Sequence, residues 1–460
     1  MTSLDLARWQ FALTTLLHFA IVGVSIGLVF FVALLQTRYH RTGEERWLRL
    51  TKYYGRAMVI VFAVGVVTGL MQTFQFGMNW AGFSRYVGDV FGAPLALEGL
   101  AAFFVESVFL GLWIFGAGKL RPRVHLACLL VLSAATMISA YSILVANSWM
   151  QNPVGYEIVD GRAQLTDIFA VMVNWTVGLT FAHVLFTSLM TGAVVVLGIA
   201  CVQIARGREV VAFGGVARMA VFVGLGAALA AAGAGHFQGV LALEQQPMKM
   251  AAAEAHYETE APAGLSLFAL GKIATDPGPP FLNIKVPAAL SFLNSFSLSS
   301  EVRGIEQLQR EAEARYGPGD YTPVVALMYW SFRLMVGGGV ALIALLAWGC
   351  RLAATGQLER SKWFLRLAPF AVSIPLAAQA GGWILREGGR QPWVVTGLLR
   401  TDAASSDVSA LAVAGSLGAF LAVYAVIFWT AGRVLRSELA HGLPARERTP
   451  RAGADLALGY

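Results

Sequence analysis

Apolar residues run through this chain in long blocks, which short polar stretches separate into nine segments. Most are at least 20 or so residues long, the length that an α-helix needs to cross the hydrocarbon core of a bilayer. They cover approximately residues 10–37, 55–77, 94–116, 125–148, 170–202, 213–242, 323–350, 364–386 and 408–432. The pattern predicts an all-α polytopic membrane protein with about nine transmembrane helices, forming a single membrane domain over residues 1–460.

The basic residues predict the orientation of these helices. Arginine and lysine gather in the connections after the first, third, fifth and seventh segments and in the tail, whereas the short connections on the opposite side carry few. The positive-inside rule then places the amino end outside and the carboxyl end in the cytoplasm. The first segment lacks a basic leader and an Ala-x-Ala cleavage site, so we interpret it as a retained helix. The residues after Leu443 are expected to be disordered.

One connection, over residues 243–322, is too long for a turn and is predicted to be a functional loop on the outer side. We expect it to open with a helix over QQPMKMAAAEAHYETEAP that carries Lys249, Glu254 and Glu258. A Pro/Gly break follows at Pro277–Pro280, and then a polar helix that ends before Gly317.

Composition agrees with a membrane protein and excludes a soluble one. Apolar residues make up 57% of the chain and charged residues only 13%, against about 25% charged residues in soluble domains. The net charge of +7 resides in the short connections, so it does not indicate nucleic acid. The three cysteines, Cys128, Cys201 and Cys350, show neither metal-site spacing nor an obvious disulfide framework.

Two carboxylates stand inside the third apolar block, whose stretch GAPLALEGLAAFFVESVFLGLWIFG spans Gly92–Gly116. These are Glu98 and Glu106, and a carboxylate at bilayer depth costs a few kcal/mol. Eight residues amount to a little over two helical turns, so both side chains fall on roughly one face, which must look inward. Either neighbouring helices donate hydrogen bonds to the two carboxylates and they have no chemical role, or the carboxylates form a stripe that carries protons or faces a cofactor.

The other polar or sulfur-bearing candidates inside the apolar blocks are His18, His183, Arg333 beside Met335, and Glu387. Counted along the helices from the inner basic residues, His18, Glu98, His183 and Glu387 lie at about 30 Å, and Met335 lies at about 24 Å. Each residue alone could be a packing residue, but a common outer layer favours flat buried cofactors. Haem iron takes histidine, and a His/Met pair is typical of electron transfer. Glu106, at about 20 Å, is placed to relay protons from the inner side.

Several stretches together resemble subunit I of the cytochrome bd-type quinol oxidases, in particular the short-loop, cyanide-insensitive-like subgroup. They are RWQFALTTLLHF, FQFGMNW, GDVFGAPLALEGLAAFFVES, ANSWMQNPVG, FAHVLFTSLMTG, QPMKMAAAEAHYET, YWSFRLMVG and GWILREGGRQPW. The resemblance covers nearly the whole chain. It implies a haem-binding helix bundle in the bacterial cytoplasmic membrane, surrounded by membrane lipids, that oxidises quinol and reduces dioxygen to water without pumping protons.

The resemblance also implies roles for individual residues. His183 and Met335 correspond to the ligands of a low-spin haem b, and Arg333 to the arginine beside that haem. His18 corresponds to an axial ligand of one high-spin haem, and Glu387, in a cluster with Trp383 and Arg390, to the ligand of the other. Glu98 corresponds to the carboxylate at the oxygen-reducing haem, Glu106 with Ser107 to the proton route, and Lys249 and Glu254 to quinol-interacting residues.

Some features implied by the resemblance stay open. Many relatives read His-Phe-Leu-Phe-Val-Pro where this chain reads HFAIVG, from His18 to Gly23, and the long connection lacks the late insertion of the long-loop subgroup. The third haem is therefore either a haem d chlorin or another haem b, and the substrate is either ubiquinol or menaquinol. A second polytopic subunit is expected as partner, with or without a small single-span subunit, and nucleic acid is not.

Two other classes of protein compete with an oxidase. A haem-free transporter with an intramembrane charge pair would show broken helices and inverted repeats, which the sequence does not display. A structural subunit with intramembrane charge pairs would carry no haem at all.

Overall fold

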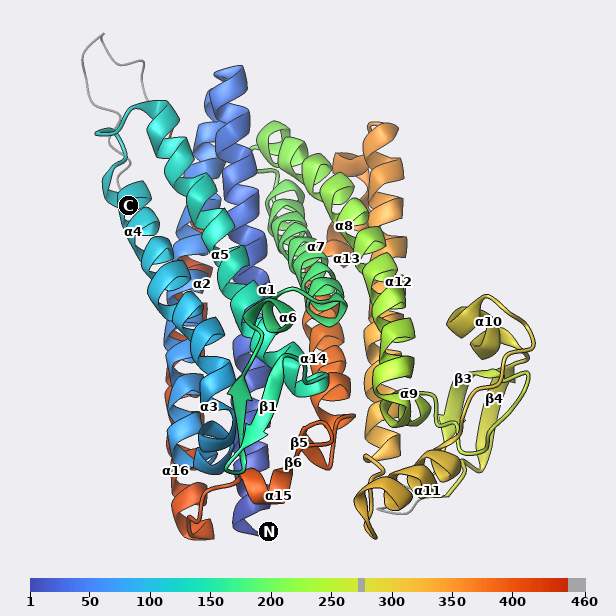
Figure 1. The fold of residues 1–460 in the computed structure, drawn as a ribbon. Coiled ribbons are helices and arrows are strands. Elements are labelled where there is room, and N and C mark those ends of the chain that lie inside the picture. The colour runs from blue at the N-terminus through green and yellow to red at the C-terminus, as the bar shows by residue number, and fades with distance from the viewer. Residues whose placement is uncertain (272–277, 446–460) are drawn as a thin grey trace.

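The structure, a computed structural model, describes residues 1–271 and 278–445. Within these residues, nine helical spans are long and apolar enough to cross a membrane, and they pack side by side as one bundle (Figure 1). The spans are α1 (Ser3–Thr42), α2 (Glu45–Met78), α3 with η1 and α4 (Ala81–Ala96, Leu97–Ala102, Phe103–Phe115), α5 (Pro122–Gln151), α6 with α7 (Ile168–Met172, Trp175–Ala205), α8 (Val210–Gln245), α12 (Val325–Ala354), α13 with α14 (Lys362–Phe370, Ser373–Gly388) and α16 (Ala410–Ala440). The predicted all-α bundle is confirmed.

The helices are longer than most of the apolar blocks that predicted them. The third span shows the largest difference, because α3 begins at Ala81 although the apolar block begins near residue 94. The added part carries Arg85 and Asp89. A helical backbone satisfies its own hydrogen bonds and can therefore continue out of the hydrocarbon core, where polar side chains carry no penalty.

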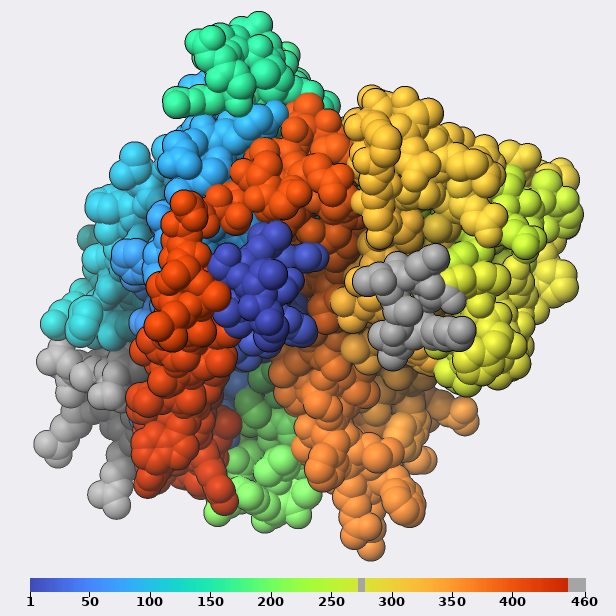
Figure 2. Space-filling view, turned by 90° about the horizontal axis from the view of Figure 1, so that it is seen from below, coloured from blue at the N-terminus to red at the C-terminus, as the bar shows by residue number. Residues whose placement is uncertain are grey.

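The amino end and the long connection lie at the same end of the bundle (Figure 1). Figure 2 looks at this end, where the amino-terminal residues lie near the centre and the yellow segment of the long connection lies to one side. The connections α1–α2, α4–α5, α7–α8 and α12–α13 lie at the other end. The relative placement agrees with the predicted topology; which end faces the cytoplasm stays a prediction.

The long connection is more structured than expected. It contains α9 (Pro247–Ala253), the antiparallel strands β3 (Leu265–Leu270) and β4 (Leu282–Val286), α10 (Ala289–Ser295) and α11 (Ile305–Tyr316). The opening helix is shorter than predicted, because it ends at Ala253 and leaves Glu254 as its cap. The polar helix ending before Gly317 is confirmed as α11. The first residue of the expected Pro/Gly break and the tail from residue 446 lie outside the described residues.

Two further hairpins and two short helices complete the described part of the fold. They are β1 (Tyr156–Val159) with β2 (Arg162–Leu165), β5 (Trp393–Val395) with β6 (Leu399–Arg400), α15 (Thr401–Ala404) and the 3₁₀-helix η2 (Leu358–Arg360). The turn between β1 and β2 is Asp160-Gly161, and both residues have positive φ. This matches the Asp-Gly preference of tight hairpin turns.

The centre of the bundle is formed by α1, which packs against α2, α5, α7, α14 and α16. It approaches α7 closely at one point, where a Cβ on Gly27 would lie 2.6 Å from the Cα of Gly192. Small residues let two backbones meet in this way, which is the usual means of close helix packing in membranes. The main apolar core, which includes Leu28, Tyr54 and Trp113, lies toward the end opposite to the long connection. The more polar half of the bundle, toward the long connection, holds the candidate site.

Candidate functional site

His183 lies on α7 and faces α8. Its Nδ1 lies 2.9 Å from the carbonyl oxygen of Ala231. A carbonyl oxygen only accepts hydrogen bonds, so Nδ1 carries the proton and Nε2 keeps its lone pair. A Cβ on Gly235 would lie 3.0 Å from Cε1 and Nδ1 of the ring, so this glycine makes room for the imidazole. An imidazole whose Nδ1–H is fixed by the protein is typical of a metal ligand.

His18, on α1, has the same arrangement. Its Nδ1 lies 2.9 Å from Oγ1 of Thr68 on α2. The Thr68 hydroxyl donates to the carbonyl of Val64 at 2.9 Å, so toward His18 it acts as an acceptor. His18 therefore donates from Nδ1 and is left with a free electron pair on Nε2. A Cβ on Gly69 would lie 3.2 Å from Cε1 of the ring, so a side chain at this position would crowd the imidazole.

Met335 brings α12 close to α14. Its Sδ lies 3.0 Å from the position that a Cβ on Gly382 would take. The next residue on α14, Trp383, contacts Phe19 with ring centroids 4.0 Å apart. Because Phe19 follows His18 in α1, these contacts bring the histidine, the thioether and the tryptophan to one level of the bundle.

Glu387 lies near the end of α14 in a network of donors. Its Oε1 accepts from Nδ2 of Asn147 at 2.9 Å and from Nε2 of Gln151 at 3.2 Å, and its Oε2 forms an ion pair with Arg390 at 2.6 Å. Arg386 donates from Nε to Oδ1 of Asn147 at 2.6 Å. The carboxylate is thus fixed from three sides, yet 30% of its side chain is exposed, whereas only 4% of the Arg390 side chain is.

Contacts with α5 show that the candidate ligands occupy two levels. Asn147 bonds Glu387, whereas Ser139, eight residues earlier on the same helix, donates to Oε1 of Glu98 at 3.3 Å. Eight residues of α-helix correspond to about 12 Å along the axis. The single layer predicted from the sequence is therefore wrong for these two carboxylates.

Glu98 and Glu106 share a face because the helix between them is not regular. In a continuous α-helix, residues eight apart would point about 80° away from each other. The π-helix η1 (Leu97–Ala102) inserts an extra residue and reduces this difference to about 20°. Ser139 accordingly lies within reach of both carboxylates. Glu106 is buried, whereas Ser107, expected beside it on the proton route, lies on the exposed face of the helix.

Lys249 and Glu254 lie close in the sequence but face different surroundings. The Nζ of Lys249 donates to Oε1 of Gln151 at 2.5 Å, toward the Glu387 network. Burial, together with Arg386 and Arg390, lowers the pKa of Lys249 well below its usual range. Glu254 instead forms an ion pair with Arg333 at 2.6 Å. Burial raises the pKa of Glu254, although Arg333 opposes this.

A cavity of about 290 Å³ lies beside Glu254, between α8, α9 and α10. Its wall combines the apolar side chains of Leu243 and Met250 with Glu254 and His256. His256 donates from Nε2 to the carbonyl of Val302 at 3.0 Å, and burial lowers the pKa of its ring. Lys249 is not part of this wall. The cavity therefore presents an imidazole and more than one carboxylate beside its apolar side chains, because Glu244, Glu301 and Arg303 line it as well.

Comparison with known proteins decides the family. Residues 6–443 match the family described as "Cytochrome bd terminal oxidase subunit I". The chain belongs to this family. It is 45% identical to cytochrome bd ubiquinol oxidase subunit 1 of Bacillus subtilis, over 95% of this chain and 92% of the relative. It is 33% identical to cytochrome bd-II ubiquinol oxidase subunit 1 of Escherichia coli, over 92% of this chain and 93% of the relative. The solved bd oxidase of Geobacillus thermodenitrificans matches with a TM-score of 0.86 at 28% identity, over 96% of this chain and 99% of that one.

Membership of a cytochrome family implies haem, and the side chains of this subunit I fit that group. Two imidazoles keep Nε2 available for iron, and a thioether lies on a neighbouring helix. Arg390 is buried with Nε and Nη1 lacking hydrogen-bond partners among the described residues. Burial lowers the pKa of Arg390, and the Glu387 charge opposes this. Such a desolvated cation with spare donors fits a carboxylate such as a haem propionate.

The sequence reasoning missed several residues of this subunit I site. Asn147, Gln151 and Arg386 hold Glu387 in place, Thr68 orients His18, and Ser139 faces both membrane carboxylates. Asn147 and Gln151 lie in the stretch ANSWMQNPVG, and Arg386 lies in GWILREGGRQPW directly before Glu387. Both stretches contribute to the family resemblance, so these three residues could have been named from the sequence. Thr68 and Ser139 gave none, because single hydroxyls inside apolar helices usually bond their own backbone.

Gly23, the last residue of the stretch HFAIVG, is in close contact with a side chain of α14. A Cβ on Gly23 would lie 2.5 Å from Oε1 of Gln379. Gln379 in turn donates to Oγ1 of Thr191 on α7 at 2.7 Å. The glutamine thus fills the space beside Gly23 and connects α14 with α7.

Proposed function

We propose that this chain is the haem-carrying subunit of a quinol:oxygen oxidoreductase that serves as a terminal respiratory oxidase. The observation that carries the proposal is the pair His18 and His183. Each lies on a different helix, donates from Nδ1 to a neighbouring helix and keeps Nε2 available. Together with membership of the cytochrome bd family, this arrangement favours iron ligation over packing.

Quinol would be oxidised at the cavity beside Glu254. The apolar side chains of Leu243 and Met250 suit the ring and tail of a quinol, and Glu254 lies on the same wall, where it could accept a hydroxyl proton. A carboxyl whose pKa is raised by burial is a better proton acceptor near neutral pH than an ordinary glutamate. Arg333 holds the carboxylate by its ion pair and lies on α12, two residues before Met335. The site of proton release and the nearest haem ligand would therefore share one helix.

We propose that His183 and Met335 hold a low-spin haem b, and that His18 and Glu387 hold the two high-spin haems. The third haem is either a haem d chlorin or another haem b. Haem, when bound, supplies electron transfer and the reduction of oxygen. Trp383 and Arg390 would line the same region, the arginine facing a propionate.

Protons for water formation would come from the opposite side of the membrane, past Glu106 and Glu98. For each dioxygen, two quinols lose four electrons and four protons, and the oxygen takes up four of each to form two waters. If quinol protons leave on the outer side and protons for water enter from the cytoplasm, charge is separated without a pump. The burial of Glu106 and the position of Ser139 within reach of both carboxylates support such a route.

The partners and location follow from the family. The relatives are named as subunit 1 of an oxidase, so we expect a second polytopic subunit, with or without a small single-span one, in the bacterial cytoplasmic membrane. The substrate is either ubiquinol or menaquinol. Of two Bacillus subtilis relatives, the one 45% identical to this chain is named a ubiquinol oxidase subunit, and the one 28% identical is named a menaquinol oxidase subunit.

The proposal is tested on the purified complex by its reduced-minus-oxidised absorption spectrum, haem extraction and oxygen consumption with quinol. We expect haem b bands, haem extractable from the complex, and oxygen uptake that depends on quinol. Pyridine haemochrome analysis distinguishes a chlorin from a third haem b. A colourless complex that transports a solute would instead support a haem-free transporter, and a colourless inactive one would support a structural subunit.

A further inference from the structure

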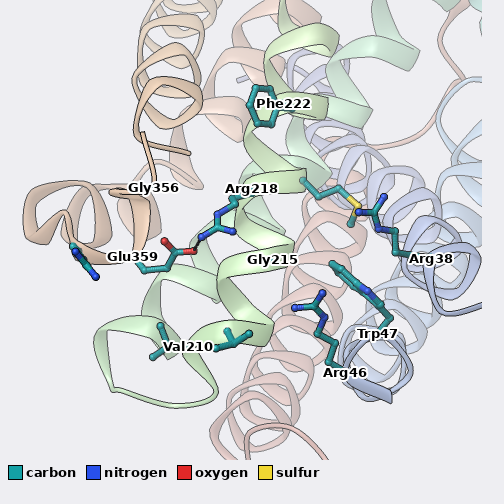
Figure 3. A pocket seen from close by; sticks show the side chains of 12 residues that line it. Arg38, Arg46, Trp47, Val210, Gly215, Arg218, Phe222, Gly356 and Glu359 are labelled. Atoms are coloured by element: carbon teal, nitrogen blue, oxygen red, sulfur yellow. Dashed lines mark hydrogen bonds and ion pairs between the residues drawn. The ribbon is translucent and has the colours of Figure 1, made fainter. Parts of the chain in front are cut away.

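A second cavity, of about 630 Å³, lies at the end of the bundle opposite to the long connection. It is far in the fold from the candidate haem and quinol residues, because its lining comes from the α1–α2 connection, the start of α8 and the α12–α13 connection (Figure 3). Arginine-rich connections between apolar helices are expected where the helices leave the bilayer. The cavity therefore lies at the membrane surface.

The lining of this cavity is strongly cationic. Among the described residues that line it, the only carboxylate is Glu359, and the arginines are Arg38, Arg46, Arg218 and Arg360. Glu359 forms an ion pair with Arg218 at 2.6 Å (Figure 3). Arg38 and Arg360 are exposed and have no ion pair within the described part of the chain. An excess of positive charge therefore faces the cavity.

Trp47 holds two of these arginines on one wall. Its indole is buried, with 4% exposed, and the guanidinium carbons of Arg38 and Arg46 lie 5.6 and 5.1 Å from the centre of its ring. Figure 3 shows the indole between the two side chains. Cation–π contacts of this kind orient guanidinium groups without neutralising them. Arg46 is also ion-paired with Glu44, so Arg38 is the cation of this wall that stays available for an anion.

The other wall of the cavity is apolar except for Arg218, which is paired with Glu359. It is formed by α8, which presents Val211, Met219 and Phe222 along the cavity. Val211 is 75% exposed and Phe222 is 54% exposed. The twelve helical steps from Val210 to Phe222 rise by about 18 Å, from the basic end of the cavity toward the bilayer. The cavity thus has a cationic end at the membrane surface and an apolar end toward the hydrocarbon core.

We propose that this cavity binds the phosphate of an anionic phospholipid headgroup, with an acyl chain lying along α8. Arginine binds phosphate oxygens through paired N–H donors, and basic pockets between membrane helices are suited to anionic headgroups. A soluble anion would use the arginines but would leave the apolar wall without a partner. The bound lipid would join the α1–α2 connection to α8 and to the α12–α13 connection.

The test uses the purified oxidase complex in detergent and native mass spectrometry with added phosphatidylglycerol. The test variant is Arg38→Gln/Arg360→Gln, because both side chains are exposed and neither supports the fold through an ion pair. The matched control is Arg123→Gln, which removes an exposed arginine at the same end of the bundle but outside the cavity. We expect one retained phosphatidylglycerol in the wild type and in the control, and about 30-fold weaker binding in the double variant.

Two further measurements separate a lipid from other occupants. Zwitterionic phosphatidylcholine should be retained poorly, and millimolar glycerol 3-phosphate should not displace phosphatidylglycerol, since it lacks acyl chains. Equal retention by the double variant, equal retention of phosphatidylcholine, or full displacement by glycerol 3-phosphate would each overturn the proposal. So would loss of a co-purifying subunit from the double variant while lipid retention is unchanged.

Discussion

Lys249 donates a hydrogen bond from Nζ to Oε1 of Gln151 at 2.5 Å, and this bond joins the long connection to helix α5. Gln151 in turn donates from Nε2 to Oε1 of Glu387 at 3.2 Å. One amide side chain thus accepts from a buried lysine and donates to a candidate haem ligand. Lys249 therefore belongs to the network around Glu387 and does not line the cavity beside Glu254.

The substitution Gln151→Leu should destabilise the protein because it leaves a buried lysine without its acceptor. The cost of such an unsatisfied polar group is about 1–3 kcal/mol. The double variant Gln151→Leu/Lys249→Met removes both partners and should recover part of that loss, since the desolvated amine is gone. Thermal unfolding of the purified complex measures both. Purely additive effects of the two substitutions would show that the two side chains are not coupled.

The activity of the enzyme with quinol should depend on the protonation of Glu254. Burial raises the pKa of this carboxyl above 4.5, and only the deprotonated form can accept a proton. At low quinol concentration, kcat/KM should therefore fall as pH decreases through the raised pKa, at a higher pH than an ordinary glutamate would cause. Glu254→Gln should lower kcat/KM and remove this acid limb, whereas Glu258→Gln, at an exposed position four residues on, should preserve it.

A second variant tests the direction of this pH effect. Arg333 stabilises the ionised form of Glu254 through the 2.6 Å ion pair. Removing that cation in Arg333→Gln should raise the pKa of Glu254 further and shift the acid limb of kcat/KM to higher pH. An unchanged pH profile in both Glu254→Gln and Arg333→Gln would place the proton acceptor elsewhere.

The helices could be predicted from the sequence because hydrophobic length alone specifies a membrane span. Their ends were less predictable, since Arg85 and Asp89 interrupt the apolar pattern but not the helical backbone. The π-helix between Glu98 and Glu106 could not be predicted, because the residues of Leu97–Ala102 are compatible with an ordinary α-helix. The strands β3 and β4 were missed, since the connection was treated as helices around a break.

The site was only partly predictable for a similar reason. His18, His183 and Glu387 are conspicuous as polar residues in apolar blocks, so single-sequence reasoning finds them. The partners that orient them come from other helices, as Thr68 and Ala231 do, and no local pattern marks them. The different surroundings of Lys249 and Glu254 likewise depend on tertiary contacts.

The glycine beside His183 should be required for haem binding. In Gly235→Ala the new methyl group would lie 3.0 Å from Cε1 and Nδ1 of His183, so the imidazole must move away from the Ala231 carbonyl. We expect reduced haem content, measured from the reduced-minus-oxidised spectrum per mole of protein. Gly239→Ala, one turn further along α8 and with no atom within 4 Å of the new Cβ, is the control and should keep its haem. Equal spectra for the two variants would contradict the ligand role of His183.

The thioether of Met335 should define the low-spin haem. Met335→Leu keeps a similar volume but removes the sulfur, so the haem at His183 should lose its sixth ligand and its sharp α-band in the reduced spectrum. Met328→Leu provides the control, because Met328 lies two turns earlier on the same helix and packs against Gly388. An unaltered α-band in Met335→Leu would assign the second ligand to another residue.

The buried carboxylate of Glu106 should control proton delivery without holding a haem. Glu106→Gln keeps the size of the side chain but cannot carry a proton, and general acid–base groups contribute about 10²–10⁴-fold to rate. We therefore expect oxygen consumption to fall by at least about 100-fold while the haem spectrum stays close to that of the wild type. Ser107 lies on the exposed face of the same helix, so Ser107→Ala should leave turnover nearly unchanged. If Ser107→Ala slowed turnover as much as Glu106→Gln did, the proton route would run along the other face of the helix, and if neither variant slowed it, Glu106 would be a structural carboxylate.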